Sequence, residues 1–151
     1  MAQIDITDAA RPDLTINPDE AFFILMKARE FDEKVEDADQ DDGSNPTDDK
    51  ALDALEEQGA DSTEEELIAS IERLNDDAQL DLITLIWIGR GDFSLAEWDE
   101  ARAAARDIGR ERLPRYVCGI PLVSDYLDDA LAQLGFALED YMDVGRPARL
   151  P

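Results

Sequence analysis

Side chains that could carry covalent chemistry are scarce in this sequence. It contains no histidine, which removes the Ser/His and Cys/His catalytic arrangements and histidine-based metal sites. The one candidate nucleophile is Cys118 in "YVCGIP", just before an expected helix start and close to Arg115, an environment that can lower the pKa of a thiol. The apolar neighbours favour a buried packing role instead. Carboxylate pairs such as Asp128 and Asp129 are too frequent for any one pair to indicate catalysis, so we assign no catalytic residue.

The segment "GRGDFSLAEWDE", residues 89–100, resembles the second half of a calcium-binding EF-hand loop and the start of its exiting helix. If Gly91 takes the sixth loop position, Glu97 takes the twelfth, as calcium binding requires. The first, third and fifth positions then hold residues without a side-chain oxygen: Ile86, Ile88 and Arg90. A glycine turn leading into a capping box of Ser94 and Glu97 explains the same pattern. We therefore expect no calcium, no other metal and no cofactor.

The basic residues are concentrated in one part of the chain. Arg102, Arg106 and Arg110 are spaced at i, i+4 and i+8, which places them on one face of a continuous helix, and Arg112 and Arg115 follow. Three interpretations are open: an internal counter-surface for the acidic regions, a solvated face paired with acidic neighbours on the same helix, or a site for a ligand or partner. The candidate interaction residues are Arg102, Arg106, Arg110 and Arg115.

The net charge is the most unusual property of the chain. The sequence has 38 acidic and 14 basic residues and a net charge of −24, with 26 acidic and 6 basic residues in the first 81 positions. Such a field opposes binding to nucleic acid or anionic membrane and attracts cationic partners. We expect no direct nucleic-acid binding and no membrane association. The partner class that the charge favours is another protein, with a basic surface, although the acidity could also serve solubility alone.

Length and composition are those of a single globular domain spanning residues 1–151. The 151 residues include 44% apolar residues, and no apolar run is long enough for a membrane-spanning helix. The amino terminus lacks the basic start and apolar stretch of a secretory signal. A single cysteine cannot form an internal disulfide, which agrees with a reducing compartment. These features predict a cytoplasmic protein, while its oligomeric state is left open.

Helix-start and helix-stop signals recur along the chain. Asn17 and Pro18 start a helix expected to run to about residue 36, and Ser62 with Glu65 forms a capping box for the next long one. Further helices are expected at about 47–58, 75–89, 94–108 and 121–134, with the nearly all-apolar stretch 82–88 at the centre of the core. Pro114 is expected to stop the fifth of these six helices, and 116–120 to form an apolar connection. The predicted fold is all-α, a compact bundle of about five to six helices.

Three segments are not expected to join the bundle. Residues 1–16 form an extended arm, and residues 142–151, with Gly145 and two prolines, form a frayed tail. Residues 36–50 are almost entirely acidic or polar and cannot bury enough apolar surface to offset their ordering entropy. We therefore expect a mobile, disordered acidic loop at 36–50, either a docking segment for a basic partner or a tolerated surface insertion.

Two late motifs carry a family resemblance. "LITLIWIGRGDFSLAEWDEA" followed by "YVCGIPLVSDYLDDALAQLG" resembles an uncharacterised family of small acidic helical bacterial proteins, the domain of unknown function DUF3775. Members of that family pair an aliphatic-Trp-aliphatic-Gly-Arg-Gly-Asp segment with a later Tyr, Gly, Pro-Leu and Tyr-Leu pattern. The resemblance covers about residues 14–135 apart from the acidic loop, implies a helical bacterial domain and transfers no catalytic residue.

These observations favour a non-enzymatic protein-interaction or regulatory module. One alternative is an acidic mimic of nucleic acid, which would need carboxylates arrayed on a rigid surface, and the expected mobility of residues 36–50 argues against it. A second alternative is an enzyme that uses Cys118 or a carboxylate pair in a cleft between helices.

Overall fold

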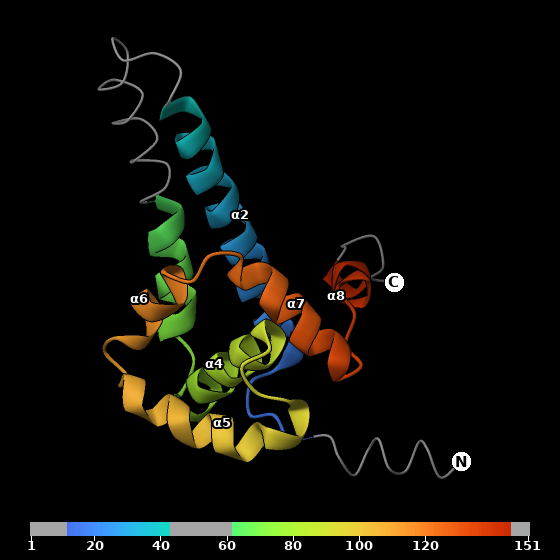
Figure 1. Cartoon of the computed structure of the whole chain (residues 1–151). Coiled ribbons are helices and arrows are strands. Elements are labelled where there is room, and N and C mark those ends of the chain that lie inside the picture. The colour runs from blue at the N-terminus through green and yellow to red at the C-terminus, as the bar shows by residue number, and fades with distance from the viewer. Residues whose placement is uncertain (1–11, 43–61, 146–151) are drawn as a thin grey trace.

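The computed structural model describes residues 12–42 and 62–145, and the side chains of 12–35 and 62–141 (Figure 1). Within these ranges every regular element is helical, which confirms the all-α prediction. The elements are α2 (Pro18–Asp42), a helix over residues 62–72, α4 (Asp76–Arg90), the 3-10 turns η1 (Leu95–Glu97) and η2 (Arg106–Ile108) on either side of α5 (Trp98–Ala105), α6 (Leu113–Cys118), α7 (Val123–Gln133) and α8 (Leu138–Gly145).

Helix α4 forms the centre of the molecule, as its apolar sequence predicts. Leu82, Ile83, Leu85 and Ile86 are completely buried, and α5 and α7 pack on different sides of the helix (Figure 1). The helix begins at the predicted N-cap, where the side chain of Asn75 accepts a hydrogen bond from the Ala78 amide at 2.8 Å. A helix that is apolar on nearly every side can be stable only when other helices cover it, so α4 organises the bundle.

The contact between α4 and α7 requires a glycine. A Cβ atom built on Gly89 would overlap the carbonyl oxygen of Tyr126, which belongs to the backbone of α7. The two helices therefore approach each other more closely than any side chain at this position would allow. Two residues further along, Gly91 ends α4 in the left-handed conformation (φ 94°), and its amide donates to the carbonyls of Trp87 and Ile88. The capping box predicted at Ser94 and Glu97 follows directly and is confirmed.

The first helix starts where it was predicted and ends later. The Asp19 amide donates to the Asn17 side chain at 2.8 Å, and the Asn17 amide donates to Glu20 at 3.2 Å, so both groups cap the start. The prediction that the helix ends near residue 36 is wrong, because α2 continues to Asp42. Local propensity explains the difference, since no glycine or proline interrupts the chain before Gly43. Residues 36–42 of the expected acidic loop are therefore helical, while 43–50 and the helix expected at 47–58 lie outside the described residues.

The region between α5 and α7 also differs from the prediction. Gly109, with φ 85°, ends the helical stretch after η2, and Pro114 lies in the first turn of α6 rather than stopping the helix before it. Proline is tolerated there because the first turn needs no amide from it. Residues 116–118 are consequently helical and not part of an apolar connection. At the end of α7, Gly135 adopts the left-handed conformation (φ 92°) expected of a C-terminal cap.

The two ends of the described chain are attached to the bundle. Residues 12–17 have no regular secondary structure, as expected for the arm, but Ile16 is buried in the core. The predicted frayed tail is wrong for residues 142–145, which belong to α8. This short helix packs beside α2, where the rings of Phe22 and Tyr141 stack with centroids 5.4 Å apart. The tertiary contact explains why a segment with weak helix signals is ordered. Residues 1–11 and 146–151 lie outside the described chain.

We expect Gly89→Ala to lower the free energy of unfolding by about 2 kcal/mol or more, because the added methyl group forces α4 and α7 apart. Gly119→Ala is the matched control, since a Cβ there meets the nearest carbonyl oxygens at an ordinary 3.6 Å and the backbone φ is −84°. Urea unfolding followed by circular dichroism measures both variants. Equal stability of the two would contradict the close backbone contact.

Candidate functional site

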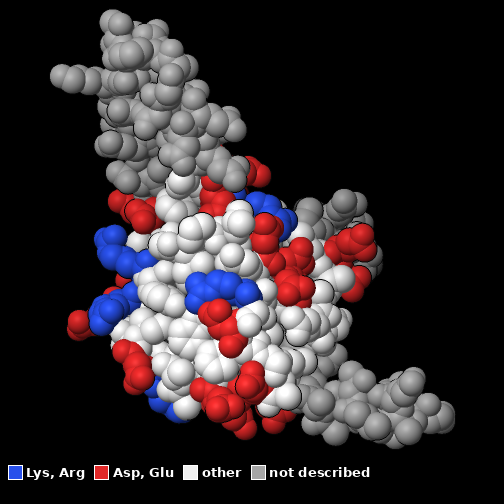
Figure 2. All heavy atoms as spheres, viewed as in Figure 1, with Lys and Arg blue, Asp and Glu red and all other residues white. Residues whose placement is uncertain are grey.

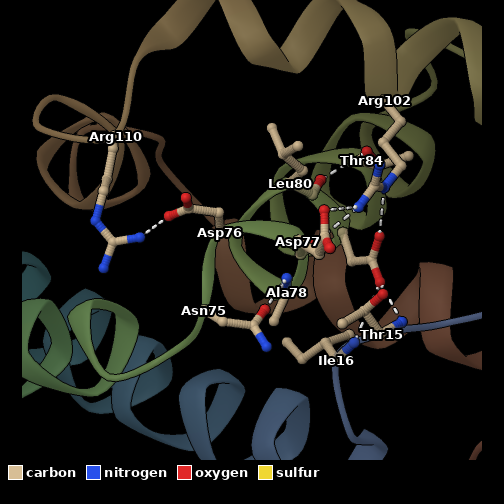
Figure 3. A network of polar contacts seen from close by, with 11 residues as sticks. Thr15, Ile16, Asn75, Asp76, Asp77, Ala78, Leu80, Thr84, Arg102 and Arg110 are labelled. Atoms are coloured by element: carbon tan, nitrogen blue, oxygen red, sulfur yellow. Dashed lines mark hydrogen bonds and ion pairs between the residues drawn. The ribbon is translucent and has the colours of Figure 1, made fainter.

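Arg102 acts as an internal counter-charge. Its Nε donates to the Asp81 carboxylate at 2.8 Å, and a terminal nitrogen donates to the carboxylate of Asp77 at 3.1 Å and to the Asp77 carbonyl at 3.2 Å (Figure 3). Its side chain is 19% exposed. The hydrogen bond with Asp81, and then that with Asp77, raise the pKa of Arg102 further above its already high range. Of the three interpretations of the arginines, the internal counter-surface describes this residue.

Arg110 does not lie on the same continuous helical stretch as Arg102 and Arg106, so the prediction that these three arginines share one helix face is wrong. The conformation of Gly109 ends the helical stretch before Arg110, which lies in the following turn and pairs with the exposed Asp76 at the start of α4 (Figure 3). Arg106 is exposed and has no polar partner among the described residues, and it lines a cavity of about 140 Å³ together with Arg110 and Asp76. Arg115 is exposed on α6, away from this cavity.

Asp81 is the residue that the sequence analysis missed. Its side chain is 1% exposed, although it is a carboxylate in the second turn of α4. One carboxylate oxygen accepts hydrogen bonds from the amides of Thr15 at 2.6 Å and Ile16 at 3.1 Å. The other oxygen accepts a hydrogen bond from Nε of Arg102. A buried carboxylate needs such donors to offset its desolvation. The signal in the sequence was the single acidic residue inside the apolar run "LDLITLIWI".

The two motifs that carry the family resemblance meet in space. The indole nitrogen of Trp87, from the first motif, donates to the hydroxyl of Tyr116, from the second, at 2.8 Å. Gly89 lies against the backbone of Tyr126, again one residue from each motif. Arg90 forms two hydrogen bonds with Asp92, at 2.9 and 2.6 Å. Trp87, Gly89, Tyr116 and Tyr126 therefore position α4, α6 and α7 relative to one another.

The environment of Cys118 opposes its use as a nucleophile. Burial, followed by the negative charge of Glu64, raises the pKa of the thiol to about 12, and Arg115 counteracts this only in part. A thiol with this pKa is protonated near neutral pH, and the thiolate is the reactive form. The arrangement fits the packing role that its apolar neighbours predicted.

The EF-hand-like segment forms the turn between α4 and η1. Ile86 and Ile88, at the first and third loop positions, are buried in the core, and the Glu97 carboxylate accepts the Ser94 amide at 2.8 Å. Within the described part of the chain, no group of three or more Cys, Asp or Glu side chains could hold a metal ion. None of the described helices is long and apolar enough to cross a membrane.

A groove of about 460 Å³ lies between α2 and the connection from α6 to α7. Phe31, Asp32 and Val35 line it from α2, and the opposite wall is the segment 118–122. Val35 and Leu122 are 39% and 47% exposed, and Leu122 has a positive φ of 62°. Figure 2 shows an uncharged surface on one face of the molecule, interrupted by charged side chains and bordered by both acidic and basic groups. The groove thus joins exposed apolar side chains to an acidic helix.

Comparison with known families identifies the central segment. Residues 64–136 match the model of a family described as a protein of unknown function, DUF3775, and this segment contains both motifs of the resemblance. The match confirms the resemblance over this segment of the chain. Comparison with curated proteins and with solved structures finds no significant match. Helix α2 and the arm lie outside the matched segment, so the Asp81 network and the groove each join family and non-family parts of the chain.

We expect Asp81→Ala to lower the free energy of unfolding by about 3 kcal/mol, because it leaves two amides and a partly buried guanidinium without their acceptor. Arg110→Gln is the control, because its ion pair with Asp76 is exposed and should contribute less than about 1 kcal/mol. Chemical unfolding measures both. If Asp81→Ala is as stable as Arg110→Gln, the network is not a structural requirement.

Cys118 should react slowly with iodoacetamide while the protein is folded. At pH 8.5 we expect alkylation roughly a thousandfold slower than in urea, because the folded thiol ionises only near pH 12 whereas an unfolded thiol ionises near about pH 8.5. The unfolded state therefore loses its proton first, so this group's contribution to stability falls as pH rises from about 8.5 towards 12. Mass spectrometry of the alkylated protein measures the rates, and equal rates in both states would contradict the shifted pKa.

Proposed function

We propose that this protein is a non-enzymatic binding module that recognises a cationic surface of another protein. The observation that carries the proposal is the distal half of α2, which we define as Glu30–Asp42. Figure 1 shows this part of the helix extending beyond the body formed by α4, α5 and α7. It carries eight acidic residues and one lysine. The helical backbone spaces these acidic residues regularly along the helix axis.

Electrostatics supports a cationic partner. The whole chain has a net charge of −24, which raises the local concentration of basic partners and speeds their association. Self-repulsion among the acidic residues of the distal half disfavours the compact state, and a basic surface would relieve it on binding. Such a contact should weaken as salt increases, because exposed charges are screened within about 8 Å at physiological ionic strength.

A second function, the acidic nucleic-acid mimic, gains support from the same helix. This alternative needs carboxylates at regular positions on a rigid surface, and α2 continues as a helix to Asp42 where a mobile loop was expected. The mimic differs from the general binding module in its target, which would be the nucleic-acid site of a basic protein. It predicts that duplex DNA and this protein exclude each other from the partner.

The test is capture of partners from the native lysate by the full chain and by a charge-neutralised variant. The variant replaces Asp37, Asp39, Asp41 and Asp42 with Asn, in the distal half of α2. The matched control makes an equal charge change elsewhere, on α7 and α8, with four amide substitutions: Asp128→Asn, Asp129→Asn, Glu139→Gln and Asp140→Asn.

We expect the wild type and the control to capture basic proteins, identified by mass spectrometry, and the α2 variant to lose them. Raising the salt to about 0.5 M should release the partners from the wild type. Release by duplex DNA at constant salt would favour the mimic over the general module. Capture that is the same for all three proteins would overturn the proposal.

A further inference from the structure

We propose that the groove between α2 and segment 118–122 receives a basic amphipathic helix of the partner, with Leu122 as its central apolar contact. The inference rests on the proposed function and deepens it, because it names the surface and the kind of segment that binds there. Three features of the described residues support it: the apolar lining, the backbone conformation of Leu122 and the charge beside the groove.

The lining of the groove is apolar and incompletely covered. Phe31 and Cys118 are half-buried and Ile120 is buried, while Val35 and Leu122 are exposed on opposite walls. Only one further large hydrophobic side chain among the described residues is exposed, Phe23, which lines a separate cavity. Single exposed apolar side chains are common, but two on facing walls of one groove form a surface that a partner can cover.

The backbone of Leu122 gives the strongest indication. Its φ of 62° and ψ of 26° lie in the left-handed region, and no other non-glycine residue in the described chain has a positive φ. Such a conformation costs on the order of 1 kcal/mol for a side chain like leucine, and glycine or asparagine adopts it more readily.

The local structure does not need a leucine at this position. The Leu122 carbonyl accepts the amides of Asp125 at 3.0 Å and Tyr126 at 3.3 Å, and any residue in this conformation would supply the same carbonyl. Burial does not offset the strain either, because the side chain is 47% exposed. A strained, exposed leucine in a groove is explained if the side chain contacts a ligand.

Charge selects a basic segment as the occupant. Asp32 lines the groove from α2, and its carboxylate also accepts a hydrogen bond from Ser124 at 3.4 Å. Asp32 is the one charged residue among the described residues that line the groove, so a segment seated in it would lie beside a carboxylate. A helix with apolar residues at i, i+3, i+4 and i+7 and lysines elsewhere meets both requirements.

The probe is a synthetic helical peptide of leucine and lysine in this pattern, about 14 residues long, compared with a scrambled peptide of the same composition. Affinity for the full chain is measured by calorimetry, and the site is located from amide shifts of Gly119 and Ile120. We expect the patterned peptide to bind at least about tenfold more tightly than the scrambled one.

Leu122→Asn separates binding from folding. We expect this variant to melt at the wild-type temperature or higher, because asparagine relieves the backbone strain, and to bind the peptide about tenfold more weakly. Leu122→Gly should show the same loss of affinity. Phe23→Ala, which removes the exposed apolar side chain outside the groove, should bind like the wild type.

Equal affinity for the two peptides would overturn the groove as the site, as would unchanged binding by Leu122→Asn or an equal loss in Phe23→Ala. These outcomes can be told apart from failure of the proposed function. The α2 variant could lose its lysate partners while the patterned and scrambled peptides bind with equal affinity. In that case the proposal of a cationic partner holds and the proposal of the groove as its binding site fails. If no partner depends on α2, the proposed function fails.

Discussion

A single buried carboxylate determines how three parts of this protein are joined. Asp81 lies in the second turn of the central helix and is 1% exposed, so its carboxylate oxygens need hydrogen-bond donors that come from elsewhere. The amides of Thr15 and Ile16 supply two and Arg102 supplies the third. The chain before α2, the core of α4 and the face of α5 are thereby held in one arrangement. A hydrophobic core alone would not specify this arrangement, because apolar contacts lack direction.

The family motifs describe mainly how the scaffold is built. Gly89 permits the close approach of α4 and α7, and Trp87 and Tyr116 join α4 to α6 by a hydrogen bond. Leu122 is the exception, because it is exposed and its backbone is strained where glycine would serve the turn. Leu122 therefore differs from the motif residues that position helices, and it lies in the groove between α2 and segment 118–122.

The correction to α2 changes how the acidity is understood. Composition predicted that residues 36–50 cannot form part of a packed core, and that argument concerns burial. It does not prevent helix formation, and the chain continues helically to Asp42 because its first strong helix breaker is Gly43. A regularly spaced acidic helix can present its charges to a partner, which a mobile loop does less well because binding must also order it.

Local signals in the sequence were enough for the helical class, for the starts at Asn17 and Asn75, for the turn at Gly91 with its capping box, and for the burial of 82–88. These features depend on interactions between residues that are close in sequence, so they can be predicted from the sequence alone. Tertiary structure decided the rest. Three features depend on residues far apart in the chain: the burial of Asp81, the pairing of Arg102 and Arg110 with different carboxylates, and the packing of α8 against Phe22. Periodicity aligned Arg102 and Arg110 on one face, but the positive φ of Gly109 turned the chain between them, and only the packed structure shows which carboxylate each one meets.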